Sequence, residues 1–236
     1  VAAQLDSPYG LAVNERGDVF IADLGNARVR RVSPDGTITT IAGGGSGGVS
    51  WKGGTRITHI AKDIALSAPR NVACMGGHVF VSDFAAHRVY RIDDAGAITA
   101  LAGTGNAGYS GDGDAAVNAR LAYPAGITAD HTGVYIADSQ NGVIRRVADG
   151  LITTVAHANT PTAVAFDAGG VLHVTEAATG NLVRLPKNGS PTVEMRGATD
   201  VALAHDSSLW VTDANRGLAW VLTARSERSL GAGNGK

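Results

Sequence analysis

Five carboxylates recur along the chain, each at the end of a short segment in which apolar residues alternate with others. The segments read VFIAD, VFVSD, VYIAD, LHVTE and LWVTD, and their acids are Asp23, Asp83, Asp138, Glu176 and Asp213. A ring of carboxylates could hold a metal ion, but a group present in every copy of a repeat serves a need of every copy. We therefore interpret these acids as structural groups that accept backbone N–H bonds or pair with an arginine of the next strand. The arginines considered for this pairing are Arg31, Arg91, Arg146 and Arg184.

Three of the seven histidines fall in connections that we expect on one face of the fold: His59, His87 and His157. Three histidines can hold a catalytic zinc ion with an open fourth position. These three come from separate connections, and no local spacing enforces their convergence. We interpret them as surface residues and keep a zinc site as the alternative.

Other signals for cofactors or catalysis are weak. The segment SGDGD (110–114) offers carboxylates to calcium, but it lacks the further oxygen ligands of an EF-hand. Cys74 lies in an apolar segment without an evident basic partner, so we expect a buried thiol rather than a nucleophile. The chain has no G-x-S-x-G, H-E-x-x-H, P-loop or C-x-x-C motif. We expect no cofactor, with zinc or calcium as alternatives, and favour a non-catalytic role.

The elements that carry these residues form an internal repeat. Each acid-terminated strand follows a short apolar strand, namely GLAV (10–13), NVAC (71–74), GITA (126–129), AVAF (163–166) or DVAL (200–203). A third strand comes next, namely RVRRV (28–32), RVYRI (88–92), VIRRV (143–147), NLVRL (181–185) or LAWVL (218–222). A fourth follows, from TITTIAG (37–43) in the first copy to ERSLGAG (227–233) in the last. Each copy therefore predicts a four-stranded antiparallel meander.

The spacing of the copies predicts the architecture. The acids lie 60, 55, 38 and 37 residues apart, so two insertions, 43–68 and 103–123, lengthen a smaller repeat. Radial stacking of such sheets buries both faces of each, which is the β-propeller arrangement. We predict an all-β fold, a five-bladed β-propeller of four-stranded antiparallel blades, as one domain over 1–236. The predicted blades are 8–43, 69–103, 124–157, 161–197 and 198–233.

The motifs of these copies resemble a known family. P-x-G-L-A-V, V-F-I-A-D-x-x-N-x-R-V-R-R-V, I-T-T-I-A-G and the linker G-Y-S-G-D-G-D-A-A are similar to those of NHL-repeat β-propellers, especially the bacterial type. The fourth copy departs in having Glu176 for the aspartate, and the fifth has Trp220 and Val221 in place of the arginine pair. Members of the family commonly have six blades, so the chain could be a closed five-bladed ring or part of a longer one. The resemblance implies a scaffold that binds a protein or carbohydrate ligand, with a metal-dependent lyase or lactone hydrolase at the channel mouth as the alternative.

Up-and-down geometry places the connections between repeats and the turns between second and third strands on one side, which we call the loop face. At the start of each first strand the repeat favours small residues, and the departures are Tyr9, Arg70, Asn71 and Asp200. We predict that these four bind a ligand, together with Trp51 and Tyr109 of the two long connections. Two alternatives stay open: Arg70 and Asp200 could form a solvated pair, and the aromatic residues could fold back on their own loops.

Charge and hydropathy limit the classes of partner that the chain is expected to bind. The net charge is −1 and no basic run is present, so nucleic acid is disfavoured. No apolar stretch approaches the roughly 20 residues of a membrane span, so we expect no membrane insertion. The sequence starts at Val1, and we expect a domain of a larger multidomain chain, with an extracellular or periplasmic location favoured.

Overall fold

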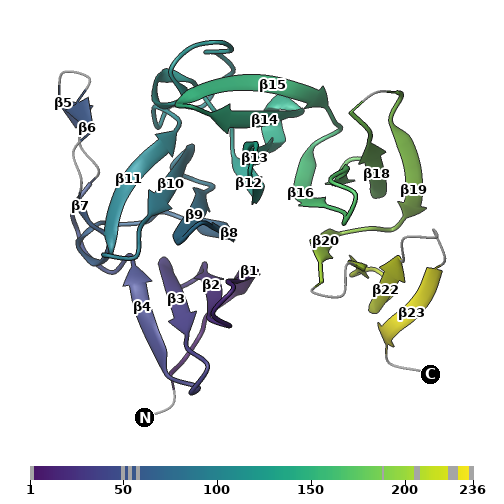
Figure 1. Cartoon of the computed structure of the whole chain (residues 1–236), viewed down its shortest axis with the longest axis horizontal. Coiled ribbons are helices and arrows are strands. Elements are labelled where there is room, and N and C mark those ends of the chain that lie inside the picture. The colour runs from purple at the N-terminus through teal and green to yellow at the C-terminus, as the bar shows by residue number, and fades with distance from the viewer. Residues whose placement is uncertain are drawn as a thin grey trace. The chain divides into compact units, whose positions relative to one another are not determined.

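The computed structural model describes residues 3–48, 51–52, 55–56, 59–187, 189–204, 208–222 and 228–233, with the side chains of 51–52, 55–56 and 228–233 left out of the description. As predicted, the fold is an all-β, five-bladed β-propeller of antiparallel sheets (Figure 1). The chain divides into two compact units, 1–136 with 146–153 and 137–145 with 154–236. None of the described helices is long and apolar enough to cross a membrane.

Two sheets belong wholly to the first unit. The first sheet is β1 (Pro8–Val13), β2 (Val19–Asp23), β3 (Arg28–Val32) and β4 (Ile38–Ala42), in that order. The second is β8 (Pro69–Met75), β9 (His78–Asp83), β10 (Arg88–Ile92) and β11 (Ala97–Ala102), with β7 (His59–Ile60) added beyond β11. Each is a meander because short polar turns join strands whose apolar residues alternate.

The remaining sheets follow the same order. The third contributes to both units and is β12 (Pro124–Asp130), β13 (Gly133–Asp138), β14 (Val143–Ala148) and β15 (Leu151–His157). The second unit holds β16 (Pro161–Phe166), β17 (Leu172–Glu176), β18 (Asn181–Leu185) and β19 (Thr192–Arg196) as the fourth sheet. The fifth sheet is β20 (Asp200–Leu203), β21 (Leu209–Asp213), β22 (Leu218–Leu222) and β23 (Arg228–Gly233).

The first long connection does not stay at the loop face as expected. It forms the pair β5 (Trp51–Lys52) and β6 (Thr55–Arg56), then β7, then the 3-10 turn η1 (Ala61–Asp63). β7 pairs with the first residues of β11, where His59 lies opposite Ile98, and the amide of Ala61 donates to the carbonyl of Gly96. The connection therefore reaches the end of the second sheet away from the loop face, because it satisfies the exposed edge of β11.

The second long connection also covers an outer edge. Its 3-10 turn η2 spans Ala116–Asn118, and a bridge joins Ala115 to Leu151 at the start of β15. A third such turn, η3 (Ser139–Asn141), joins β13 to β14. Both insertions are thus edge-covering segments as well as loops.

Apolar side chains fill the space between neighbouring sheets. The predicted packing positions Val72, Ile127, Val164 and Val201 are at most 5% exposed, in agreement with the sequence. The prediction is wrong for the equivalent Leu11, which is 63% exposed. Burial of this position depends on a neighbouring sheet, and the described residues supply none over this face of β1.

Candidate functional site

The recurring acids fasten the connections between repeats at the loop face. The Asp83 carboxylate accepts the amides of Ser67 and Ala68, at 2.9 and 2.7 Å. Asp23 likewise accepts the amide of Asp6, and Glu176 accepts the amide of Asn159. Burial raises the pKa of Asp83, and its backbone hydrogen bonds and the charge of Arg88 only partly oppose this. These three acids thus hold the chain immediately before a first strand, and in the first two sheets that strand carries the predicted ligand-binding residues Tyr9 and Arg70.

Two of these acids pair with an arginine one residue from the predicted one, and Asp213 pairs with Arg216 of the following turn. Arg30 pairs with Asp23 at 3.4 Å, and Arg145 pairs with Asp138 at 3.6 Å. The reason is the two-residue period of a strand, which places Arg31 on the sheet face opposite to Asp23. Three of the expected arginines have other partners: Arg31 pairs with Asp18, Arg146 donates to the carbonyl of Thr132, and Arg184 pairs with Glu194. Arg91 likewise lies on the sheet face opposite to its acid, Asp83.

Arg70 lies at the centre of a group of side chains at the loop face of the first unit. Its Cζ is 4.6 Å from the ring centroid of Tyr9 and 4.6 Å from that of Phe84. Its Nη2 donates a 3.0 Å hydrogen bond to the Tyr9 hydroxyl. Rings within about 6 Å of a guanidinium attract it through their negative faces. The predicted residues Tyr9 and Arg70 are therefore in contact, and Phe84 completes an aromatic clamp.

Two more side chains extend this group. The ring centroid of Tyr123 lies 4.9 Å from that of Phe84 and 4.5 Å from that of His87, in an edge-on arrangement with His87. The amide of Tyr123 donates to Nδ1 of His87 at 3.2 Å. Burial lowers the pKa of His87, with the charge of Asp83 opposing, so the imidazole is neutral at pH 7. We call Tyr9, Arg70, Phe84, His87 and Tyr123 the Arg70 cluster.

Two members of the Arg70 cluster occupy backbone conformations that favour glycine. His87 has φ 51° and Tyr123 has φ 54°. Gly142, Gly180 and Gly217 occupy the position of His87 in the last three repeats, with φ of 65–66°. A bulky residue in this region costs about 1–3 kcal/mol and persists where the surroundings or the function demand it. The same conformation occurs at Ala27, equivalent to His87, and at Ser7 and Thr160, equivalent to Tyr123, so it belongs to the geometry of the repeat.

The sequence reasoning missed Phe84, and it did not select Tyr123. Phe84 follows the recurring acid, where the other repeats have Leu24, Ser139, Ala177 and Ala214. Tyr123 precedes the proline of its first strand, where the first, second and fourth repeats have Ser7, Ala68 and Thr160. The comparison of repeats that selected Tyr9 and Arg70 would have found both residues if extended to these columns.

Asn71 packs against the first sheet at a point of close backbone approach. A Cβ on Gly10 would lie 2.5 Å from the Cα of Asn71, so only glycine fits there. The backbone amide of Asn71 donates to the Ser82 hydroxyl at 3.1 Å, and a ligand contact of its side chain stays a prediction. Asn71 therefore positions β8 beside β1, and its side chain lies against Gly10.

The other predicted ligand residues have contacts within their own segments or fall outside the description. Asp200 begins β20 of the second unit, and its Oδ1 accepts the amide of Val201 at 2.8 Å. Tyr109 is 53% exposed, and its hydroxyl donates to Asp112 of the same connection at 3.1 Å. Trp51 lies in β5, with its side chain outside the described residues.

The three candidate zinc ligands occupy different places. His59 lies beside Ile98 near the end of the second sheet away from the loop face, whereas His87 lies at the loop face. His157 lines an open loop-face cavity of about 450 Å³ in the second unit, with Asn159 and Thr160. Among the described residues, no group of three or more His, Cys, Asp or Glu side chains is placed to hold a metal ion. The zinc and calcium alternatives stay predictions.

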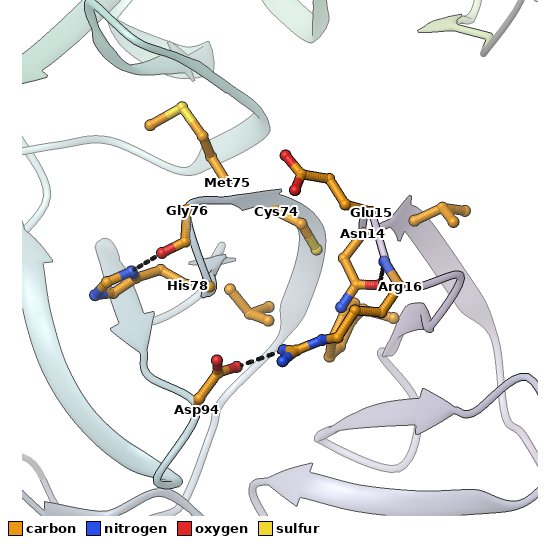
Figure 2. A pocket seen from close by; sticks show the side chains of 12 residues that line it. Asn14, Glu15, Arg16, Cys74, Met75, Gly76, His78 and Asp94 are labelled. Carbon is orange, nitrogen blue, oxygen red and sulfur yellow. Dashed lines mark hydrogen bonds and ion pairs between the residues drawn. The ribbon is translucent and has the colours of Figure 1, made fainter.

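A second cavity of the first unit, about 380 Å³, opens between the first-to-second strand turns of the first two sheets (Figure 2). Arg16 and Asp94 form a 2.8 Å ion pair across it, and His78 bonds the carbonyl of Gly76. Cys74 lines the cavity, and burial, with a smaller effect of Asp18, raises the pKa of its thiol to about 12. The thiol is therefore protonated at neutral pH and is a poor nucleophile.

Fold and site together define a β-propeller with an aromatic and cationic group at its loop face. No family model matches the chain. Teneurin-m of Drosophila melanogaster is 29% identical over 167 residues, which cover 64% of this chain and 5% of that protein. The chain thus spans a small part of this relative.

Three solved structures share the fold. Virginiamycin B lyase from Staphylococcus aureus, solved with quinupristin, has a TM-score of 0.66 at 18% identity and covers 98% of this chain and 71% of its own. A chain of the nidogen/laminin complex has a TM-score of 0.70 at 20% identity, with 94% and 78% covered. A gluconolactonase from Xanthomonas campestris has a TM-score of 0.73 at 15% identity, with 96% and 76% covered. The matches support a propeller with NHL-like repeats, a fold that occurs in enzymes and in a protein complex.

Proposed function

We propose that the chain is a non-catalytic, NHL-type β-propeller module that binds a protein partner through the loop face of its first unit. The observation that carries the proposal is the Arg70 cluster, in which a guanidinium is clamped between two rings. Tyrosine and arginine are the residue types most enriched at the energetic centres of protein interfaces. Tyr9 is 50% exposed, so a partner can reach the clamp.

A further point supports a protein partner. The nidogen/laminin match shows that a propeller of this type occurs in a protein–protein complex. A carbohydrate ligand, which could stack on Tyr9, is the outcome that the test must separate from a protein.

Site-specific photo-crosslinking tests the proposal. A photoreactive phenylalanine analogue replaces Tyr9, and the matched control carries it at His78 in the cavity away from the loop face. We expect Tyr9 to crosslink one protein from extracellular or periplasmic material of the source organism, and His78 to crosslink none. The purified partner should then bind at least tenfold more weakly to Tyr9→Ala and to Phe84→Ala, and equally well to Arg16→Ala.

The same variants separate the alternatives. Binding to a glycan array that Tyr9→Ala abolishes, without a protein crosslink, would replace the protein partner by a carbohydrate. If the purified chain binds stoichiometric zinc and His87→Ala loses it, the alternative of a metal-dependent lyase or lactone hydrolase is favoured. Equal crosslinking from Tyr9 and His78 would remove the loop face as the binding surface.

A further inference from the structure

Arg70 differs from other arginines of the fold in what stabilises its charge. Arg30, Arg145 and Arg184 each have a carboxylate within 4.0 Å. Among the described residues of the first unit, no carboxylate lies within that distance of the Arg70 guanidinium, whose contacts are two rings and one hydroxyl. The charge of Arg70 is thus held in place without being neutralised.

The hydrogen-bonding state of Arg70 is also incomplete. A guanidinium has five N–H donors, and one bond, from Nη2 to Tyr9, is made. Its Nε is buried and has no hydrogen-bond partner among the described residues. A buried donor without a partner costs about 1–3 kcal/mol, and more for a charged group. Because this Nε is closed to solvent, a ligand meets the terminal nitrogens of the half-buried guanidinium instead.

The two rings leave part of the guanidinium open to an acceptor. The Cζ atom lies over the Tyr9 and Phe84 rings at 4.6 Å from each centroid, and one terminal nitrogen, Nη2, already donates to Tyr9, so the other terminal donors remain for an acceptor. The planar donor fork matches a carboxylate in a bidentate arrangement. Because Arg70 is half-buried, a charge-assisted hydrogen bond here is stronger than one in open solvent.

The charge of the cluster selects among anions. Burial lowers the pKa of His87, which favours the neutral imidazole, so Arg70 supplies the positive charge of the cluster. A single charge complements a carboxylate, whereas phosphate carries close to two negative charges and is commonly bound by several donors. An aspartate or glutamate side chain therefore fits the site better than a phosphate.

We propose that Arg70 is the anchor for a carboxylate of an aspartate or glutamate on the protein partner, with Tyr9 and Phe84 as the walls that orient it. The proposal rests on the loop-face binding function given above and names the chemistry of its centre.

The Nε–H resonance of Arg70 in ¹⁵N-labelled full chain reports on this contact directly. The probes are the capped dipeptides acetyl-Glu-Tyr-amide and acetyl-Gln-Tyr-amide, which differ by one charge, and inorganic phosphate. We expect the Glu peptide to shift the Arg70 resonance. Its half-saturating concentration should be at least tenfold lower than that of the Gln peptide or of phosphate. Arg70→Lys, which keeps the charge but loses the fork, should weaken Glu-peptide binding at least tenfold. The matched control Arg184→Lys, in a residue already paired with Glu194, should leave it unchanged.

The outcomes distinguish this inference from the function on which it rests. Equal affinity for the Glu and Gln peptides, or unchanged binding in Arg70→Lys, overturns the carboxylate anchor while a Tyr9 crosslink would still support loop-face binding. Tighter binding of phosphate than of the Glu peptide replaces the carboxylate by a phosphoryl group and also overturns the proposal. A Tyr9 derivative that crosslinks nothing, with a selective Glu-peptide response at Arg70, would leave the anchor standing and remove the protein-module function.

Discussion

Arg70 in the first unit and Arg145 in the second place the same guanidinium in opposite surroundings. Arg70 is half-buried at the loop face between two rings, and its donors are mostly unused. Arg145 is fully buried beside the Asp138 carboxylate, which is also fully buried. A buried ion pair is committed to the fold, because neither charge can be removed without exposing the other to a medium that cannot solvate it. A cation held by rings is stabilised without a counter-charge and so stays available to a ligand.

Loss of the buried cation should have the largest effect. Arg145→Ala leaves Asp138 as an unpaired buried charge, and we expect the free energy of unfolding to fall by about 3–5 kcal/mol. Arg70→Ala removes two cation–π contacts and should cost only about 1–2 kcal/mol. Urea denaturation of both variants measures the difference. If Arg70→Ala destabilises the chain as much as Arg145→Ala does, Arg70 is a structural residue and the contrast between the two sites is wrong.

A third cation, His173 in the fourth sheet, extends the comparison to pH. Its Nε2 lies 3.0 Å from Asp167 and its Nδ1 lies 2.9 Å from Glu194, which Arg184 also approaches at 3.9 Å. Burial opposes protonation of the imidazole, but the hydrogen bonds and charges of Glu194 and Asp167 outweigh it and raise the pKa of His173. His173 therefore resembles Arg145 in being a buried cation that carboxylates neutralise.

The sign of the pH effect follows from the raised pKa. The folded state binds the His173 proton more tightly than the unfolded chain, so this stabilisation is complete below the unfolded pKa of about 6.5. It is lost as the pH rises through the higher folded pKa of His173. Phe20 and Phe80 occupy this position in the first two repeats, so phenylalanine suits it. His173→Phe should therefore remove the decline of stability as the pH rises through the folded pKa of His173. Denaturation midpoints between about pH 5 and 9 measure it, with His131→Phe, an exposed histidine, as the control. A decline that persists unchanged in His173→Phe would assign the pH dependence to another group.

These contrasts show what the sequence could predict. The five sheets follow from alternation and a recurring acid, and Tyr9 and Arg70 stand out because they replace small residues. The pairing of Arg30 rather than Arg31 with Asp23 also follows from strand periodicity, which the sequence analysis did not apply to this pair. The exposure of Leu11 and the path of the connection containing His59 could not be predicted, because both depend on which strand edge or face has a neighbour. Local sequence does not encode that.

The smallest effect should come from the strained turn that carries His87. Ala27 occupies the equivalent position in the first repeat with φ 52°, and glycine removes the steric cost of the left-handed conformation. We expect Ala27→Gly to stabilise the chain by up to about 1 kcal/mol, part of the relief being offset by the greater entropy of the unfolded chain. His87→Gly should gain less or lose stability, because it also removes the ring contact with Tyr123 and the acceptor for its amide. Thermal unfolding of the two variants, followed by partner binding, separates strain from contact. A larger gain in His87→Gly than in Ala27→Gly, with binding intact, would show that the ring of His87 supports neither the turn nor the Arg70 cluster.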